Sequence, residues 1–183
     1  MATVTAGFPG WAPSLGERVA GIDASLEAGA GEIEAVLNRD AFLAGDERLV
    51  AEEITAFREV CGGSTLKVIL EAGELGSPEL IRGAAFLAMD VGADFLKTST
   101  GKVGTGATPA AARCMMEAVR DFSDESGRRV GIKVAGGVHR FEQAFEYLQL
   151  QRNILGTDWL TPSLFRIGAT SLLDDVAMRR GAR

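Results

Sequence analysis

Charged side chains interrupt short apolar segments that otherwise have the composition of buried strands. They are Glu34, Lys67, Lys97, Lys133 and Arg166. An unpaired buried charge is costly, so each could simply pair with a partner or reach solvent. Several of them near the carboxyl ends of successive strands are harder to explain by structure alone, because functional groups of α/β folds gather at that end.

The segment "DFLKTSTGK" (94–102) places Lys97 at the end of an apolar run. A free lysine has a pKa of about 10.4 and is almost wholly protonated at neutral pH, whereas an amine attacks a carbonyl only when it is neutral. Burial and the nearby charge of Lys133 would both lower the pKa of Lys97. A carboxylate such as Glu34, with water, could then move the proton of an enamine. These residue types indicate a Schiff-base lyase.

Glycines and hydroxyl side chains follow the later strands, in "TSTGK" (98–102), "AGG" (135–137) and "GATS" (168–171). Backbone N–H groups and hydroxyls at helix starts can bind phosphate, although ordinary turns and helix caps use the same residues. The segment "STGKV" is not a P-loop, since the earlier glycine is missing and Val103 stands where Ser or Thr would hold magnesium.

His139 is the single histidine of the chain, and we expect it to help begin a helix near Arg140. Cys61 and Cys114 lie in predicted helices without metal-ligand spacing or a disulfide framework. The sequence therefore predicts no metal. It also predicts reduced cysteines and a cytoplasmic location.

These residues are positioned by six predicted strands that alternate with six predicted helices. The strands cover 2–8, 32–37, 65–70, 93–99, 130–136 and 164–169, and the helices cover 14–29, 46–61, 77–92, 108–126, 140–150 and 170–180. Such alternation predicts a parallel sheet with helices outside it, either a barrel or an open doubly wound sheet. No G-x-G-x-x-G follows the first strand, which disfavours a nucleotide-binding Rossmann fold.

The composition is that of one globular domain, which we expect to span residues 1–183, with 46% hydrophobic residues. The net charge of −6 argues against nucleic acid or an anionic membrane as a partner. The first residues do not resemble a signal peptide, and no apolar run approaches 18 residues, so no membrane span is expected. The basic segment 178–183 is expected to be a solvated tail.

Three segments together resemble the deoxyribose-phosphate aldolase family, which are class I aldolases on a TIM barrel. They are "DFLKTSTGKVGTGATPAAARCMMEAVRDF", "VGIKVAGGV" and "LFRIGATSLL", and the blocks 32–46 and 66–75 match in the right order. The resemblance implies reversible cleavage of 2-deoxyribose 5-phosphate to glyceraldehyde 3-phosphate and acetaldehyde. It implies no cofactor, and a sugar phosphate and aldehydes as the small-molecule partners.

The resemblance also implies roles for individual residues. Lys97 would form the Schiff base, Lys133 would tune its pKa, and Glu34 would take part in proton transfer where the family has an aspartate. Lys67 would belong to the substrate site. The substrate phosphate would be held by Thr100, Gly101, Lys102, Gly136, Gly137, Thr170 and Ser171.

Two departures from the family pattern bear on activity. Glu34 reaches one methylene further than the aspartate, and a displacement near 1 Å can cost about 10²-fold in rate. The sequence also begins at what resembles the third strand of the family barrel, so about six of eight βα units are expected; about 70 residues are absent.

Six strands leave two unpaired edges. The chain could pair with another copy, close more tightly or be a fragment; we favour a homo-oligomer. Three functions stay open: an active aldolase, an inactive remnant that binds a sugar phosphate or self-associates, and an aldolase with a shifted aldehyde preference.

Overall fold

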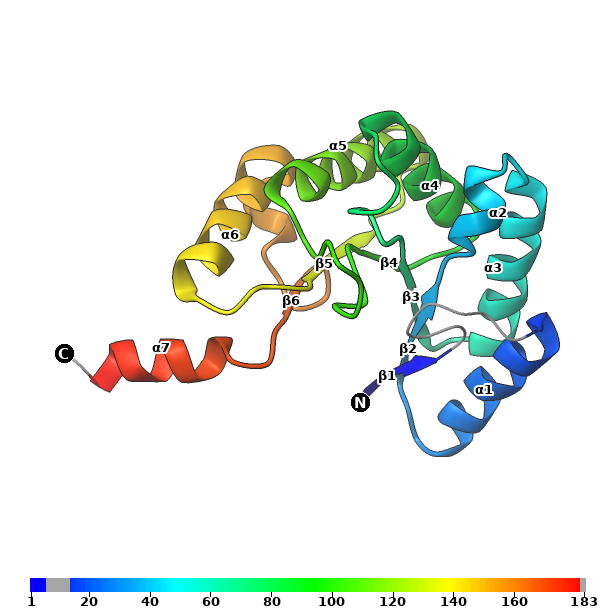
Figure 1. The fold of residues 1–183 in the computed structure, drawn as a ribbon, viewed down its shortest axis with the longest axis horizontal. Helices are drawn as coiled ribbons and strands as arrows, with labels where there is room; N and C mark the ends of the chain where they lie inside the picture. The colour runs from blue at the N-terminus through cyan, green and yellow to red at the C-terminus, as the bar shows by residue number, and fades with distance from the viewer. Residues whose placement is uncertain (6–13, 182–183) are drawn as a thin grey trace.

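The structure, a computed structural model, describes residues 1–5 and 14–181. Its strands are β1 (Ala2–Thr5), β2 (Glu32–Val36), β3 (Thr65–Ile69), β4 (Phe95–Lys97), β5 (Gly131–Ala135) and β6 (Phe165–Gly168). They form one parallel sheet in the order β1-β2-β3-β4-β5-β6. A doubly wound sheet would reverse its strand order, whereas consecutive order is that of a (β/α) barrel. Figure 1 shows the sheet curled beneath an arc of helices, a half-barrel that confirms the predicted fold class.

The helices are α1 (Leu15–Glu27), α2 (Arg39–Leu43), α3 (Glu47–Cys61), α4 (Pro78–Asp90), α5 (Pro109–Ser126), α6 (Phe141–Leu155) and α7 (Leu172–Gly181), with the 3-10 helix η1 (Thr157–Trp159). All six predicted helices are present. The sequence analysis missed α2 and η1 and ended α6 too early. The short α2 begins where the Asn38 side chain accepts a hydrogen bond from the Ala41 N–H at 3.2 Å. The predicted strand extension over 6–8 lies outside the described residues.

Two helices begin with a hydroxyl cap followed by a proline. Ser77 accepts a hydrogen bond from the Leu80 N–H at 3.2 Å, and Thr108 accepts one from the Ala111 N–H at 3.1 Å. Each cap satisfies an N–H that the helix leaves free, and the following proline has no N–H to satisfy. These caps fix where the chain turns outward after β3 and β4, and so where the loops above the sheet end.

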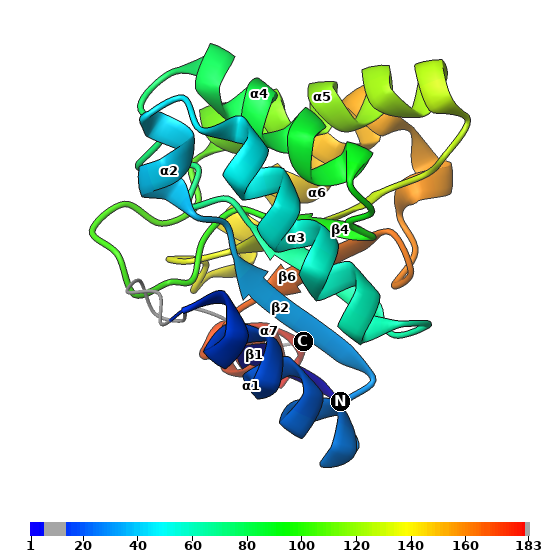
Figure 2. The same ribbon diagram turned by 90° about the vertical axis from the view of Figure 1, so that its right-hand side faces the viewer.

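The two faces of the sheet differ in chemistry. Alternate residues point to the helices and belong to the hydrophobic core, among them Ile33, Leu66, Val68, Leu96, Ile132 and Val134. Since successive strand residues point to opposite faces, the charged residues between them lie on the inner, concave face. Figure 2 shows that the helices cover the outer side. The strands therefore carry their charges on the face without helices.

The last helix extends into the basic segment that was expected to be a solvated tail, and the side chains of Met178 and Arg179 there are exposed. The structure continues α7 to Gly181, and Arg179 binds the carboxylates of Glu142 and Asp175. Figure 1 shows α7 extending away from the arc of the other helices. Among the described residues, no helix is long and apolar enough to cross a membrane.

Candidate active site

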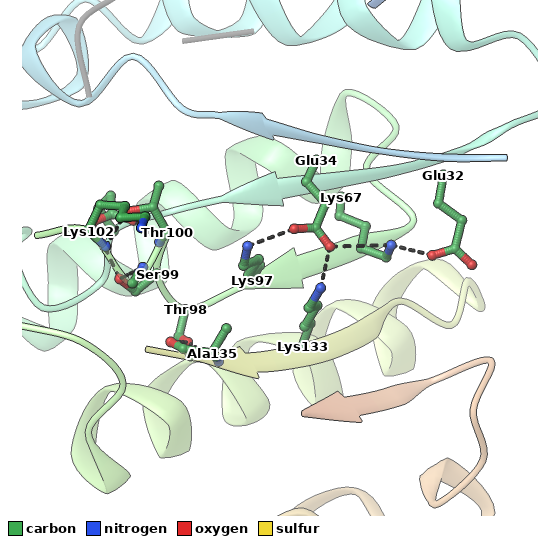
Figure 3. Close-up of polar contacts among 12 residues, drawn as sticks. Glu32, Glu34, Lys67, Lys97, Thr98, Ser99, Thr100, Lys102, Lys133 and Ala135 are labelled. Carbon is green, nitrogen blue, oxygen red and sulfur yellow. Dashed lines mark hydrogen bonds and ion pairs between the residues drawn. The ribbon is translucent and has the colours of Figure 1, made fainter. Parts of the chain in front are cut away.

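A carboxylate and three ammonium groups meet on the concave face. Glu34 Oε2 lies 2.6 Å from the Nζ atom of Lys97, and Glu34 Oε1 lies 2.5 Å from that of Lys133. The Nζ atom of Lys67 lies 3.5 Å from Glu34 Oε1. Figure 3 shows these side chains converging from β2, β3, β4 and β5. Glu34 is 1% exposed and Lys97 is 4% exposed, so these ion pairs are shielded from water.

The strand register places these groups. Lys97 of β4 is directly beside Lys133 of β5, and Lys133 is beside Arg166 of β6. Glu34 of β2 is beside Lys67 of β3. Lys67 is in turn beside Phe95 of β4, two residues before Lys97 and on the same face of the sheet. Because same-face residues recur every second position, these registers put all five predicted charges on one surface. The structure thus brings the sequence-predicted charges together.

The charges around Lys97 and Glu34, together with their burial, favour an amine at Lys97 that loses its proton readily. Burial lowers the pKa of Lys97, and the positive charge of Lys133 lowers it further, while the bond to Glu34 opposes both. Burial alone would raise the pKa of Glu34, but hydrogen bonds from Lys133 and Lys97 outweigh it and hold that pKa below its usual range. The site therefore combines an ionised carboxylate with an activated lysine.

A second carboxylate continues the cluster toward the opposite end of the strands. Both terminal nitrogens of Arg166 donate to Glu32 at 2.8 Å, and Lys67 donates to the same carboxylate. These cations lower the pKa of Glu32 to about 2, against the opposing effect of burial. Lys67 is fully buried and lies between Glu32 and Glu34. Its predicted contact with substrate stays a prediction.

A cavity of about 260 Å3 opens above Lys97 and Lys133. Of the residues predicted to hold phosphate, six line it: Thr100, Gly101, Lys102, Gly136, Gly137 and Thr170. The seventh, Ser171, has its Oγ 3.1 Å from Nδ1 of His139, which also lines the cavity. The cavity thus joins the candidate nucleophile to loops of the phosphate-binding type.

Close backbone contacts explain glycines at two of these loops. A Cβ at Gly106 would lie 2.6 Å from the carbonyl oxygen of Gly136, and Gly136 itself has a φ of 99°. A Cβ at Gly168 would lie 3.0 Å from Cε of Lys133. Side chains at these positions would push the loops apart or displace the second lysine.

Glu71 is a functional candidate that the sequence analysis missed. It follows β3, is 3% exposed, and is the one non-glycine residue with positive φ (51°) in the described chain. Its carboxylate accepts a hydrogen bond from the Thr100 N–H and lies 3.5 Å from the Ser99 hydroxyl. A charged residue directly after a strand was the available signal, the same one that marked Lys97.

The distribution of lysine is a further signal. The chain has four lysines, at positions 67, 97, 102 and 133, and all its other cationic side chains except His139 are arginines. Three lysines lie on the concave face and the fourth lines the cavity. Arginine cannot be deprotonated in proteins, so only lysine can supply a neutral amine.

Within 1–5 and 14–181, no group of three His, Cys, Asp or Glu side chains could hold a metal ion.

Comparisons with known proteins agree with this geometry. The model of the DeoC/LacD family of aldolases matches residues 8–171. The deoxyribose-phosphate aldolase of Mus musculus is 44% identical over 176 residues, covering 96% of this chain and 55% of that protein. The Agrobacterium fabrum enzyme of the same name is 46% identical over 177 residues, covering 96% of this chain and 66% of that protein.

Solved structures share the fold. A candidate deoxyribose-phosphate aldolase from Toxoplasma gondii ME49, in its apo form, has a TM-score of 0.89 at 26% identity; the match covers 100% of this chain and 71% of that one. The deoxyribose phosphate aldolase of Aeropyrum pernix, described as a tetramer, has a TM-score of 0.76 at 23% identity, covering 100% of this chain and 68% of that one. This chain therefore spans about half to two thirds of the length of the curated relatives that it matches.

Proposed function

Because the chain belongs to the DeoC/LacD family of aldolases, we propose that it is a class I aldolase. It reversibly cleaves 2-deoxy-D-ribose 5-phosphate to D-glyceraldehyde 3-phosphate and acetaldehyde. The observation that carries this proposal is the buried amine of Lys97, 2.6 Å from the Glu34 carboxylate and beneath a cavity lined by phosphate-binding loops. The chemistry needs no cofactor, because the protonated imine that the amine forms accepts the electrons of the broken bond.

The reaction begins at Lys97. Its neutral amine attacks C1 of the open-chain sugar, and uptake of a proton with loss of water gives a protonated imine. Removal of the proton from the C3 hydroxyl breaks the C2–C3 bond, releases glyceraldehyde 3-phosphate and leaves an enamine on Lys97. Protonation of the enamine carbon and hydrolysis of the imine release acetaldehyde and restore the amine.

Glu34 and Lys133 control the protons of this cycle. Glu34 contacts both amines, so it can take the proton from Lys97 and, through water, serve the C3 hydroxyl and the enamine carbon. Lys133 keeps Glu34 ionised and disfavours a second positive charge at Lys97. Thr100, Gly101, Lys102, Gly136, Gly137, Thr170 and Ser171 hold the phosphate, at the loops where (β/α) barrels commonly bind it.

A release assay tests this proposal. Wild-type chain should release acetaldehyde from deoxyribose 5-phosphate, and Lys97→Met should release none while remaining folded. If the folded wild type releases none, the function is wrong. Binding of the sugar phosphate without release, measured by calorimetry, would instead support the inactive remnant.

We also propose that the described units form a single domain that associates with further copies. The support is that β1 and β6 are the sheet edges in the described residues, and that Leu173 and Met178 of α7 are 80% and 70% exposed. Free strand edges and apolar side chains are features that association covers. Light scattering should give a mass of two or more chains; a stable monomer would contradict this.

A cytoplasmic location, with Cys61 and Cys114 free, is part of the same proposal.

A further inference from the structure

Glu32 is a charged residue of the concave face to which the proposed reaction gives no role. It lies two residues before Glu34 on β2, and so on the same face of the sheet. Arg166 donates to both of its oxygens at 2.8 Å, and Lys67 donates to one of them. Figure 3 shows Lys67 between the two carboxylates. Glu32 thus joins the edge strand β6 to the lysine that lies next to the catalytic carboxylate.

The guanidinium of Arg166 fixes the position of Glu32. Besides its two hydrogen bonds to that carboxylate, it donates from Nε to the carbonyl oxygen of Pro162 at 2.7 Å. Its Cζ atom also lies 5.4 Å from the centroid of the Phe95 ring. A two-point contact between arginine and a carboxylate restricts the orientation of the carboxylate as well as its position. Arg166 therefore holds Glu32 as a fixed partner for Lys67.

Lys67 has two carboxylates within reach, and one of them holds it. Its Nζ atom donates a hydrogen bond to Glu32 but lies 3.5 Å from Glu34 Oε1, which is longer than a hydrogen bond between charged groups. The same Oε1 atom accepts the hydrogen bond of Lys133 at 2.5 Å. Because Lys67 is fully buried, water cannot replace a lost carboxylate. Without the charge of Glu32, Lys67 would turn to Glu34 and compete with Lys133 for that oxygen.

We propose that Glu32 is a positioning residue: it holds Lys67 back from Glu34, so that this carboxylate stays on the two lysines of the proposed reaction. The inference rests on the proposed function, in which Glu34 moves the protons. Three ammonium groups converge on Glu34, and two of them, those of Lys97 and Lys133, hydrogen-bond to it. A displacement of about 1 Å can cost on the order of 10²-fold in rate, so restraint of the third lysine controls the rate without any contact with substrate.

A double-mutant cycle of Glu32→Gln and Lys67→Met tests the proposal in the acetaldehyde-release assay. Glu32→Gln keeps the size of the side chain and removes its charge, so kcat should fall about 10- to 100-fold. The KM for deoxyribose 5-phosphate should stay within about twofold of the wild type, because Glu32 is not among the residues that line the cavity. In the Lys67→Met background there is no lysine to restrain, so Glu32→Gln should change kcat by less than about threefold.

Two further variants complete the test. Glu52→Gln also removes a carboxylate that is bound to an arginine, but on the exposed side of α3, and should keep the wild-type constants. Arg166→Lys keeps the charge and loses the two-point contact with Glu32. If urea unfolding shows that Glu32→Gln is not folded, Arg166→Lys takes its place in the cycle, with the same expected dependence on Lys67.

The cycle separates failure of this inference from failure of the proposed function. A loss of kcat as large in the Lys67→Met background as in the wild type would show that Glu32 acts through the stability of the sheet, and would overturn the inference. A kcat of folded Glu32→Gln within twofold of the wild type would overturn it as well. If the folded wild type releases no acetaldehyde, the proposed function fails, and the inference that rests on it fails too.

Discussion

The two faces of the same strands carry opposite chemistry. On the outer face, Leu96 is fully buried against the helices. One residue later, on the inner face, Lys97 is almost as buried but bound to Glu34. Burial removes both side chains from water, yet it stabilises the fold at Leu96 and perturbs an amine at Lys97. Burial therefore stabilises the fold on the outer face, whereas on the inner face it lowers the pKa of a lysine.

Replacing the inner residue should have the largest effect on activity and little effect on folding. In Lys97→Met, Glu34 keeps Lys133 at 2.5 Å and Lys67 at 3.5 Å, so the carboxylate stays paired. Loss of the proposed nucleophile should lower kcat for deoxyribose 5-phosphate cleavage by at least about 10³-fold. Circular dichroism should show the wild-type fold. Residual activity within tenfold of the wild type would contradict the role proposed for Lys97, and with it the contrast between the two faces.

Replacing the outer residue should do the reverse. Leu96→Ala removes a fully buried side chain and should lower the free energy of unfolding by about 2–5 kcal/mol, through lost burial and the cavity left behind. Urea unfolding measures this loss, and kcat per folded molecule should stay near that of the wild type. A stable variant with impaired kcat would show that the two faces are not separable in this way.

The second lysine should act through the pH profile. In Lys133→Met, the positive charge that lowers the pKa of Lys97 is removed, so the pKa of Lys97 rises. A larger fraction of Lys97 is then protonated at neutral pH, and the profile of kcat against pH should move to higher pH, with part of the lost activity regained there.

Lys102→Met is the matched control for that shift, because Lys102 lines the cavity but is not among the charges that lower the pKa of Lys97. Its profile should keep the wild-type midpoint. Movement of the Lys133→Met profile to lower pH, or an equal shift in both variants, would contradict the assigned role.

The smallest effect is expected at Glu71, which positions the loop after β4. Glu71→Gln keeps an acceptor for the Thr100 N–H but loses its charge, and a charged partner strengthens such a bond by about 1 kcal/mol or more. The KM for deoxyribose 5-phosphate should rise about tenfold with kcat less affected. Glu79→Gln, an exposed change in the first turn of α4, should leave both constants unchanged. A KM within twofold of the wild type for Glu71→Gln would remove Glu71 from the site.

Local sequence signals predicted what depends on a few neighbouring residues. The strand alternation and the charges on the strands follow from local pattern, and the structure confirms them. The partners of those charges were not predictable. Arg166 binds Glu32 across 134 positions of sequence, and Lys133 binds Glu34 across 99. Such pairs are set by strand register and curvature, which no local pattern contains.

The charge of Glu71 directly after a predicted strand was a local signal, but the contacts of that carboxylate were not predictable, for a similar reason. Its importance lies in a strained backbone and in contacts with a loop 29 residues further along, and both exist only in the folded chain. The short α2 was missed because five residues are too few to show a helical period.

The most direct test of the central claim is to trap the amine. The folded chain is incubated with acetaldehyde and borohydride, weighed by intact-mass spectrometry and mapped by peptide sequencing, with Lys97→Met as the control. The account predicts one reduced two-carbon adduct on Lys97 and none in the variant; with four lysines in the chain, the assignment is unambiguous. No adduct in a folded sample, or one on Lys67, Lys102 or Lys133 instead, would contradict it.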